Sequence, residues 1–103
     1  MAVMHLEQKH YQIIETNFRC VLGEIDIIAA HEEYLIFCEV KTRSGREIHP
    51  SLSVTRKKQT KLHQLGLYFI NQRKLFQLQP RFDVISVQYS GNSPVIEHFI
   101  NAF

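Results

Sequence analysis

Hydrophobic and polar residues recur with two different periods along this chain, and each period predicts one kind of element. Stretches that are rich in β-branched and aromatic residues, or that alternate with a period of two, predict strands at 11–18, 23–30, 34–43, 81–89 and 94–100. Helices are predicted at 2–9, where Leu6 is the clearest inward-facing residue, and at 56–73. The order helix, three strands, helix, two strands predicts a mixed α/β fold.

The second predicted helix combines an apolar stripe with a basic beginning. Leu62, Leu65 and Phe69 recur at i, i+3 and i+7, as on the buried face of a helix, and Thr55 is suited to cap the first turn. The first turns are basic, so their charges oppose the helix dipole instead of complementing it. This arrangement indicates a role other than helix stability. The residues before it, 44–53, are predicted to form a loop.

Acidic side chains punctuate the second predicted strand. Ile25 and Ile27 alternate with Glu24 and Asp26, which predicts the acids on one face of this strand and the isoleucines on the other. A short polar connection then leads into the third strand. We expect the first three strands to form an antiparallel meander.

The third predicted strand carries a charge inside an apolar run. One face is predicted to hold Ile36, Cys38 and Val40, and the other Leu35, Phe37, Glu39 and Lys41. A carboxylate in such a strand costs on the order of several kcal/mol unless it is paired or bound to a metal. Glu39 therefore needs a partner.

Asp26, Glu39 and Lys41 form the candidate catalytic site. Hairpin pairing brings neighbouring strands to about 5 Å from each other, so Asp26 and Glu39 are predicted to share one Mg²⁺ or Mn²⁺ ion. Lys41, on the same side as Glu39, would orient the attacking water or stabilise charge on a phosphate. The alternative interpretation is a simple Glu39–Lys41 ion pair on an exposed sheet face, with Asp26 uninvolved.

The distribution of charge favours a polyanionic partner. The net charge is only +2, but seven of the 12 basic residues lie between positions 41 and 61, where Glu47 is the only acid. Such a cluster suits a polyanion better than a neutral metabolite. Predicted contacts with nucleic acid are Arg43, Arg56, Lys57, Lys58, Gln59 and Lys61. Glu24 and Thr42 are predicted to support the site, although simple solvent exposure of Glu24 is an open alternative.

Several motifs in order resemble a known family. Gly23–Asp26 followed by Phe37–Arg43 resembles the D…ExK motif of the restriction-endonuclease-like superfamily, and the whole chain is similar to the YraN-like family of bacterial proteins. Further matches to the latter are Asn17–Arg19, Val54–Thr55 with Lys58, Gln59 and Leu62, Arg81–Val84, Ile96–His98 and Ala102–Phe103. The resemblance implies a single restriction-endonuclease-like domain over 1–103 and, by analogy, Mg²⁺-dependent hydrolysis of phosphodiester bonds.

Two positions depart from the pattern of that family. Related junction-resolving nucleases carry an additional metal-site acid on an N-terminal helix, and this sequence begins where that helix is already under way, with Glu7 near its far end. His10 stands where the family usually has Gly before the first strand. Gln59 is expected to contact a phosphate, as the Gln of related nucleases does, unless the helix face is simply solvated.

Other classes of function lack their motifs. The histidines show no HExxH spacing, and no nucleotide-binding or acyl-transfer motif occurs. Cys20 and Cys38 lie in hydrophobic runs, which predicts reduced thiols in a cytoplasmic protein without a membrane span. Arg81 and Asp83 are interpreted as a structural pair, with contact to the site as the alternative.

The leading hypothesis is a metal-dependent nuclease acting on DNA, including structured or branched DNA. The second is a non-catalytic nucleic-acid-binding module that keeps the same fold and basic cluster. The third is a protein-interaction domain. A homodimer is compatible with each of them.

Overall fold

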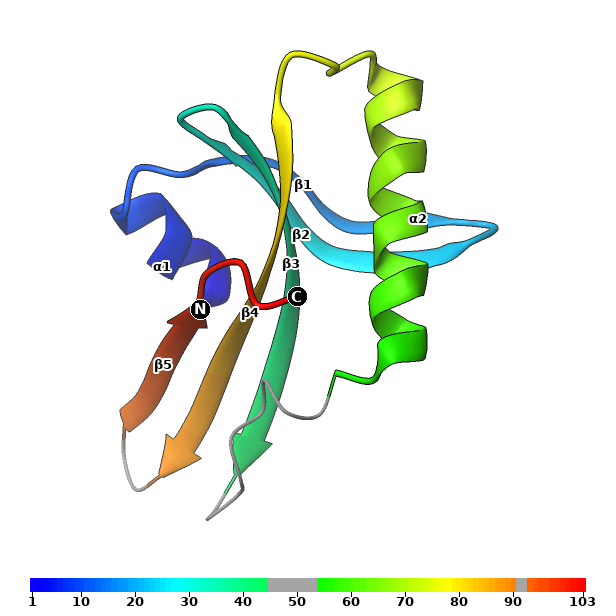
Figure 1. The fold of residues 1–103 in the computed structure, drawn as a ribbon. Coiled ribbons are helices and arrows are strands. Elements are labelled where there is room, and N and C mark those ends of the chain that lie inside the picture. The colour runs from blue at the N-terminus through cyan, green and yellow to red at the C-terminus, as the bar shows by residue number, and fades with distance from the viewer. Residues whose placement is uncertain (45–53, 91–92) are drawn as a thin grey trace.

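The computed structural model describes residues 1–44, 54–90 and 93–103 (Figure 1). The elements follow the predicted order: α1 (Ala2–Gln8), β1 (Gln12–Cys20), β2 (Gly23–His31), β3 (Tyr34–Ser44), α2 (Arg56–Arg73), β4 (Gln79–Ser90) and β5 (Ser93–Phe99). Of the predicted loop, residues 45–53 lie outside the described residues. The prediction of a mixed α/β fold is confirmed.

A five-stranded sheet in the order β1-β2-β3-β4-β5 forms the centre of the molecule. β1, β2 and β3 are the predicted antiparallel meander, and β4 pairs with β5 in the same antiparallel sense. β3 and β4 are parallel, with Phe37 opposite Phe82. Parallel neighbours need a crossover connection, and α2 lies on that connection. This mixed sheet is compatible with a restriction-endonuclease-like core.

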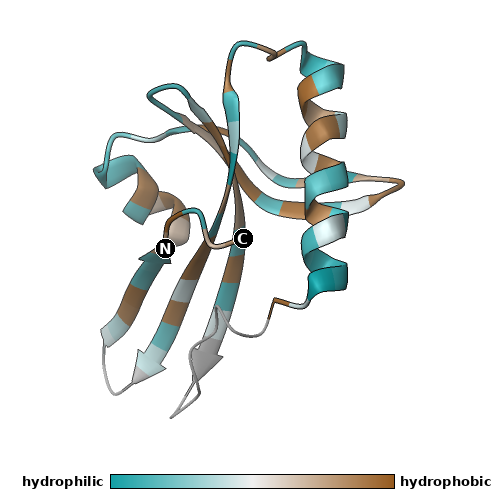
Figure 2. Ribbon diagram, viewed as in Figure 1, coloured by the Kyte–Doolittle hydropathy of each residue, from teal (hydrophilic) through white to brown (hydrophobic). Residues whose placement is uncertain are grey.

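The two helices cover opposite faces of the sheet (Figure 1). On the α2 face, Leu65 and Phe69 pack with Phe37 and Phe82 of the central strands. Figure 2 shows that the first turn of α2 is hydrophilic, whereas hydrophobic and hydrophilic positions alternate along the middle of the helix. The stripe predicted from helical spacing is thus buried against the sheet.

The α1 face has a core of its own. Leu6, which is fully buried, packs with Ile36, Cys38 and Ile85 of β3 and β4. Successive residues of β3 therefore enter different cores, as the alternation predicted. Cys38 is a buried thiol, and burial raises its pKa; both cysteines are free.

The predicted facing of β2 is wrong at one point. Ile25 belongs to the α2-side core and Ile27 to the α1-side core, although the alternation placed both isoleucines on one face. The described pairing of β2 with β3 runs from His31 only as far as Ile27, opposite Cys38. Before that point β2 parts from β3, so residues 25 and 27 no longer share one flat sheet surface.

A buried polar network joins β4 and β5 to Tyr11, the residue before β1. The carboxylate of Asp83 accepts from Arg81 Nε and Nη2 at 3.0 and 2.8 Å, and from the backbone N–H of Asn101 at 2.9 Å. His98 Nε2 lies 2.7 Å from the same carboxylate, and Arg81 also donates to the Tyr11 hydroxyl at 2.8 Å. Asp83 is fully buried. The predicted structural pair is confirmed.

Local contacts fix the position of α2. The Thr55 hydroxyl accepts from the backbone N–H of Lys58 at 3.1 Å, which is the predicted N-cap. Gly66 lies close to the sheet: a Cβ at this position would meet atoms of Phe37 and Phe82 at 3.1 Å. No helix in the described residues is long and apolar enough to cross a membrane.

Candidate functional site

The cleft between α2 and the β2–β3 strands, here called the α2 cleft, holds the predicted acids. Its volume is about 410 Å³. One wall carries carboxylates from the two strands, and the other carries ammonium groups from the first turns of α2. The acids are Glu24, Asp26 and Glu39, and the bases are Lys57, Lys58 and Lys61.

Asp26 lies where β2 parts from β3. Its Oδ2 accepts the backbone N–H of Val40 at 2.8 Å, so the carboxylate bridges the two strands beyond their last described pair. Burial, and to a lesser degree the charges of Glu39 and Glu24, raise the pKa of Asp26. Asp26 also lines a shallow depression on the α1 face of the sheet. It is therefore reachable from both sides.

Glu39 is a nearly buried acid with two cationic neighbours. Its side chain is 11% exposed, and its Oε1 lies 2.5 Å from Lys58 Nζ and 3.8 Å from Lys41 Nζ. The hydrogen bond to Glu39 raises the pKa of Lys58. The partner that an acid in this strand needs thus comes mainly from α2, which is distant in sequence.

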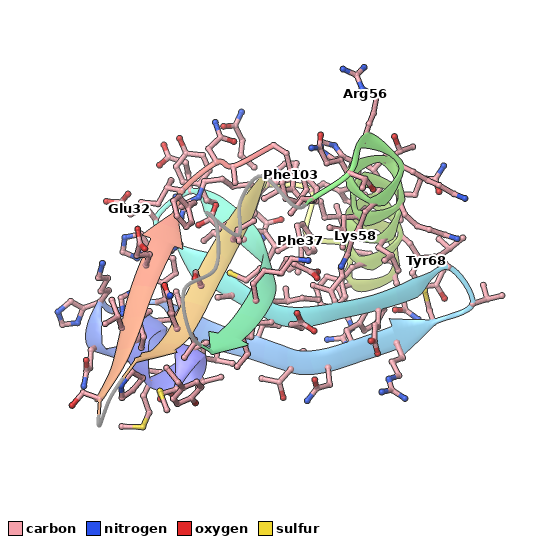
Figure 3. All side chains as sticks on the ribbon, turned by 90° about the horizontal axis from the view of Figure 1, so that it is seen from below. Glu32, Phe37, Arg56, Lys58, Tyr68 and Phe103 are labelled. Atoms are coloured by element: carbon pink, nitrogen blue, oxygen red, sulfur yellow. The ribbon has the colours of Figure 1, made fainter. Side chains whose placement is uncertain are left out.

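The basic residues of α2 divide between two faces of the helix. Lys58 and Lys61 share the stripe of Leu62 and Leu65 and line the α2 cleft. Arg56 and Gln59 line a separate surface depression with Thr60 and His63. Figure 3 shows Lys58 between α2 and the sheet and Arg56 pointing away from the sheet. Gln59 Nε2 donates to the Val54 carbonyl at 3.1 Å.

The remaining predicted residues are spread around the site. Glu24 lines the α2 cleft and pairs with exposed Arg19 at 2.8 Å. Thr42 lies on the α1 face, in the depression that Asp26 also lines. The backbone of Arg43 pairs with Gln88 in the sheet; its side chain lies outside the described part.

Carboxylates on two neighbouring strands supply oxygen ligands of the kind that a hard divalent cation prefers. Mg²⁺ prefers oxygen ligands and is commonly held by one or two carboxylates, while water and phosphate oxygens complete its shell. The hydrogen bond from Val40 uses Oδ2 of Asp26, which leaves Oδ1 for a ligand. No cluster of three or more His, Cys, Asp or Glu suited to a metal occurs among the described residues.

The sequence did not predict which apolar and small residues shape the α2 cleft. Leu22 and Gly23, at the turn between β1 and β2, line it together with Thr55. Gly23 has φ 138°, a conformation that favours glycine. The signal in the sequence was the glycine between two strand patterns, but only the packing of the hairpin under α2 places it at the cleft.

Comparison with known proteins settles the family. A model described as "Uncharacterised protein family UPF0102" matches residues 1–87. The chain belongs to this family. The YraN-like family, which the motifs resemble, is the same group. The matched residues thus include α1, the β1–β3 meander, α2 and most of β4.

Curated UPF0102 proteins from several bacteria match this chain along its full length. The protein from Geobacter metallireducens is 45% identical over 104 residues, which cover 100% of this chain and 85% of that protein. The one from Thermodesulfovibrio yellowstonii is 44% identical over 104 residues, covering 100% and 88%. The one from Caldanaerobacter subterraneus is 38% identical over 107 residues, covering 100% and 88%.

Proposed function

We propose that this UPF0102 protein is a Mg²⁺-dependent nuclease that hydrolyses phosphodiester bonds of DNA, including structured or branched DNA. The observation that supports the proposal best is the composition of the α2 cleft. Asp26 and Glu39 line one wall and Lys57, Lys58 and Lys61 the other. The acidic wall would attract a divalent cation, and the basic wall would attract the phosphate backbone of a nucleic acid.

Each side chain has a distinct part in this proposal. Asp26 and Glu39 would hold Mg²⁺ or Mn²⁺, which when bound polarises the phosphate and acidifies a water molecule. The backbone N–H of Val40 fixes the Asp26 carboxylate, so the ligand is already oriented. Lys41, 3.8 Å from Glu39 Oε1, would orient the water or neutralise charge on the phosphate.

The test is cleavage of supercoiled and four-way-junction DNA with Mg²⁺ or Mn²⁺. Asp26→Ala and Lys41→Ala are each expected to lower the rate by at least about 100-fold, the usual range for one electrostatic or acid–base group. Glu97→Ala and Lys9→Ala are matched controls, because both residues are exposed and lie outside the α2 cleft. Cutting that survives in Asp26→Ala and Lys41→Ala would remove the catalytic assignment.

A non-catalytic nucleic-acid-binding module is the second candidate, and one observation favours it. Lys58 and Lys41 already provide Glu39 with cationic partners, so the acid is compatible with burial without a metal. This candidate predicts salt-sensitive DNA binding without hydrolysis and little loss of affinity in Asp26→Ala. Absence of DNA binding at low salt would instead indicate a protein-interaction domain.

A further inference from the structure

We propose that Lys58 is an exchangeable counter-ion: a divalent cation displaces it from Glu39, and the released ammonium then binds a phosphate of the nucleic acid. The inference rests on the proposed metal site. It assigns to one side chain the coupling between metal binding and nucleic-acid binding.

The first step follows from a shared atom. Lys58 Nζ lies 2.5 Å from Oε1 of Glu39, and Glu39 is one of the two carboxylates that would hold the cation. A carboxylate oxygen in direct contact with an ammonium group offers less charge to a metal. The cation and Lys58 therefore compete for Glu39.

The second step follows from the position of Lys58 on α2. Its side chain is 43% exposed, whereas that of Glu39 is 11% exposed. The ammonium can thus turn toward solvent without unfolding α2, whose first turn is held by the Thr55 cap. It then adds its charge to the cleft wall that Lys57 and Lys61 also form.

The two steps together make metal and nucleic acid cooperative. Lys58 must leave the metal site before it can bind a phosphate, so the affinity for the metal and the affinity for nucleic acid are linked. This linkage has the same size in both directions. The exchange costs metal affinity in the absence of nucleic acid. In return, it withholds one phosphate contact until a cation is bound.

The metal arm of the test measures Mn²⁺ binding by calorimetry without nucleic acid. Lys58→Met is expected to lower the Kd for Mn²⁺ about fivefold or more, the lower end of typical coupling between sites. Lys61→Met is the matched control: it removes the same charge from the same cleft, and the described contacts of Lys61 include no ion pair with Glu39. Lys58→Arg keeps the charge and is expected to stay near the wild type.

The nucleic-acid arm measures junction-DNA affinity in EDTA and in Ca²⁺, a cation with the same preference for oxygen ligands. Lys58→Met is expected to weaken binding clearly in Ca²⁺ and little in EDTA. In a Glu39→Gln background, which lacks the carboxylate charge, the Lys58→Met effect should be the same with and without the cation.

The outcomes separate the two proposals. If the wild type binds Mn²⁺ but Lys58→Met binds it no more tightly than Lys61→Met does, the exchange is overturned and the nuclease proposal stays intact. Failure of Mn²⁺ to bind the wild type and both variants overturns the metal site and the exchange together. Thermal unfolding of each variant confirms that a loss of binding is not a loss of fold.

Discussion

Two partly or fully buried aspartates show how surroundings separate a structural acid from a candidate ligand. Asp83 is fully buried and has donors on both oxygens; the hydrogen bonds from His98, Arg81 and Asn101 outweigh burial and lower its pKa. Asp26 receives one backbone hydrogen bond, and burial raises its pKa. The first carboxylate is thus held by donors on both oxygens, whereas the described hydrogen bond of the second involves Oδ2 alone.

The Asp83 network predicts a large loss of stability when its charge is removed. Asp83→Asn leaves Arg81 as a buried cation without its counter-charge, which costs about 3–5 kcal/mol. Glu15→Gln is the matched control, because Glu15 pairs with Arg73 at side-chain exposures of 31% and 43%, and such pairs contribute about 1 kcal/mol or less. Urea unfolding measures both; equal losses would contradict the structural role of Asp83.

The same network gives the stability of the wild type a pH dependence at the acid end. Because the folded pKa of Asp83 lies below the ordinary value of 3.8, the unfolded chain binds the proton more readily. The stabilisation is therefore present above about pH 4 and lost as pH falls through the lower folded pKa. Asp83→Asn should lack this part of the acid dependence.

His10 adopts a backbone conformation that favours glycine. Its φ is 68°, which lies in the left-handed region that glycine enters without steric strain. His10→Gly should raise the free energy of unfolding by about 0.5–1 kcal/mol, since the left-handed strain exceeds the added flexibility of the unfolded chain. Thermal unfolding measures the change, and a lower melting temperature would contradict it.

Residue patterns predicted that Asp26 and Glu39 lie near each other, but they did not predict the neighbours of these acids. Asp26 and Glu39 came from strand alternation and motif spacing, and both line the α2 cleft. Lys58 was predicted to contact phosphate, yet it pairs with Glu39, because contacts between α2 and β3 depend on packing that local spacing does not encode.

At the scale of elements, the distance between α2 and β3 sets the width of the cleft. Gly66→Val should destabilise the fold by about 1–3 kcal/mol, because the added side chain must displace the rings of Phe37 and Phe82. Leu67→Val is the matched control: it also introduces a β-branched residue into the helix, but at a position that is 59% exposed. Chemical denaturation of both variants tests this, and similar losses would show that the close approach is unimportant.

Element prediction succeeded where one pattern decided the outcome. The helices and strands lie close to their predicted ranges, because core stripes and strand alternation are local properties. The facing of Ile25 was wrong because it depends on where β2 leaves β3, and only the whole sheet decides that.

At the scale of the molecule, the central strands are buried on both faces. β3 contributes Leu35 and Phe37 to one core and Ile36 and Cys38 to the other. Glu39 follows directly on this segment, so the proposed ligand is carried by a well-packed element rather than by a loop. Rigid support of this kind suits a site that must hold a cation in fixed geometry.

The parallel pairing of β3 with β4 also has a consequence for synthesis on the ribosome. The described side chains of the α2 cleft come from positions 22 to 65, whereas β4 begins at Gln79. In a nascent chain, the acidic and ammonium side chains that line the cleft are therefore synthesised before β4, the strand that pairs with the open edge of β3. Until β4 leaves the ribosome, the residues of the cleft are present but the complete sheet that positions them is not.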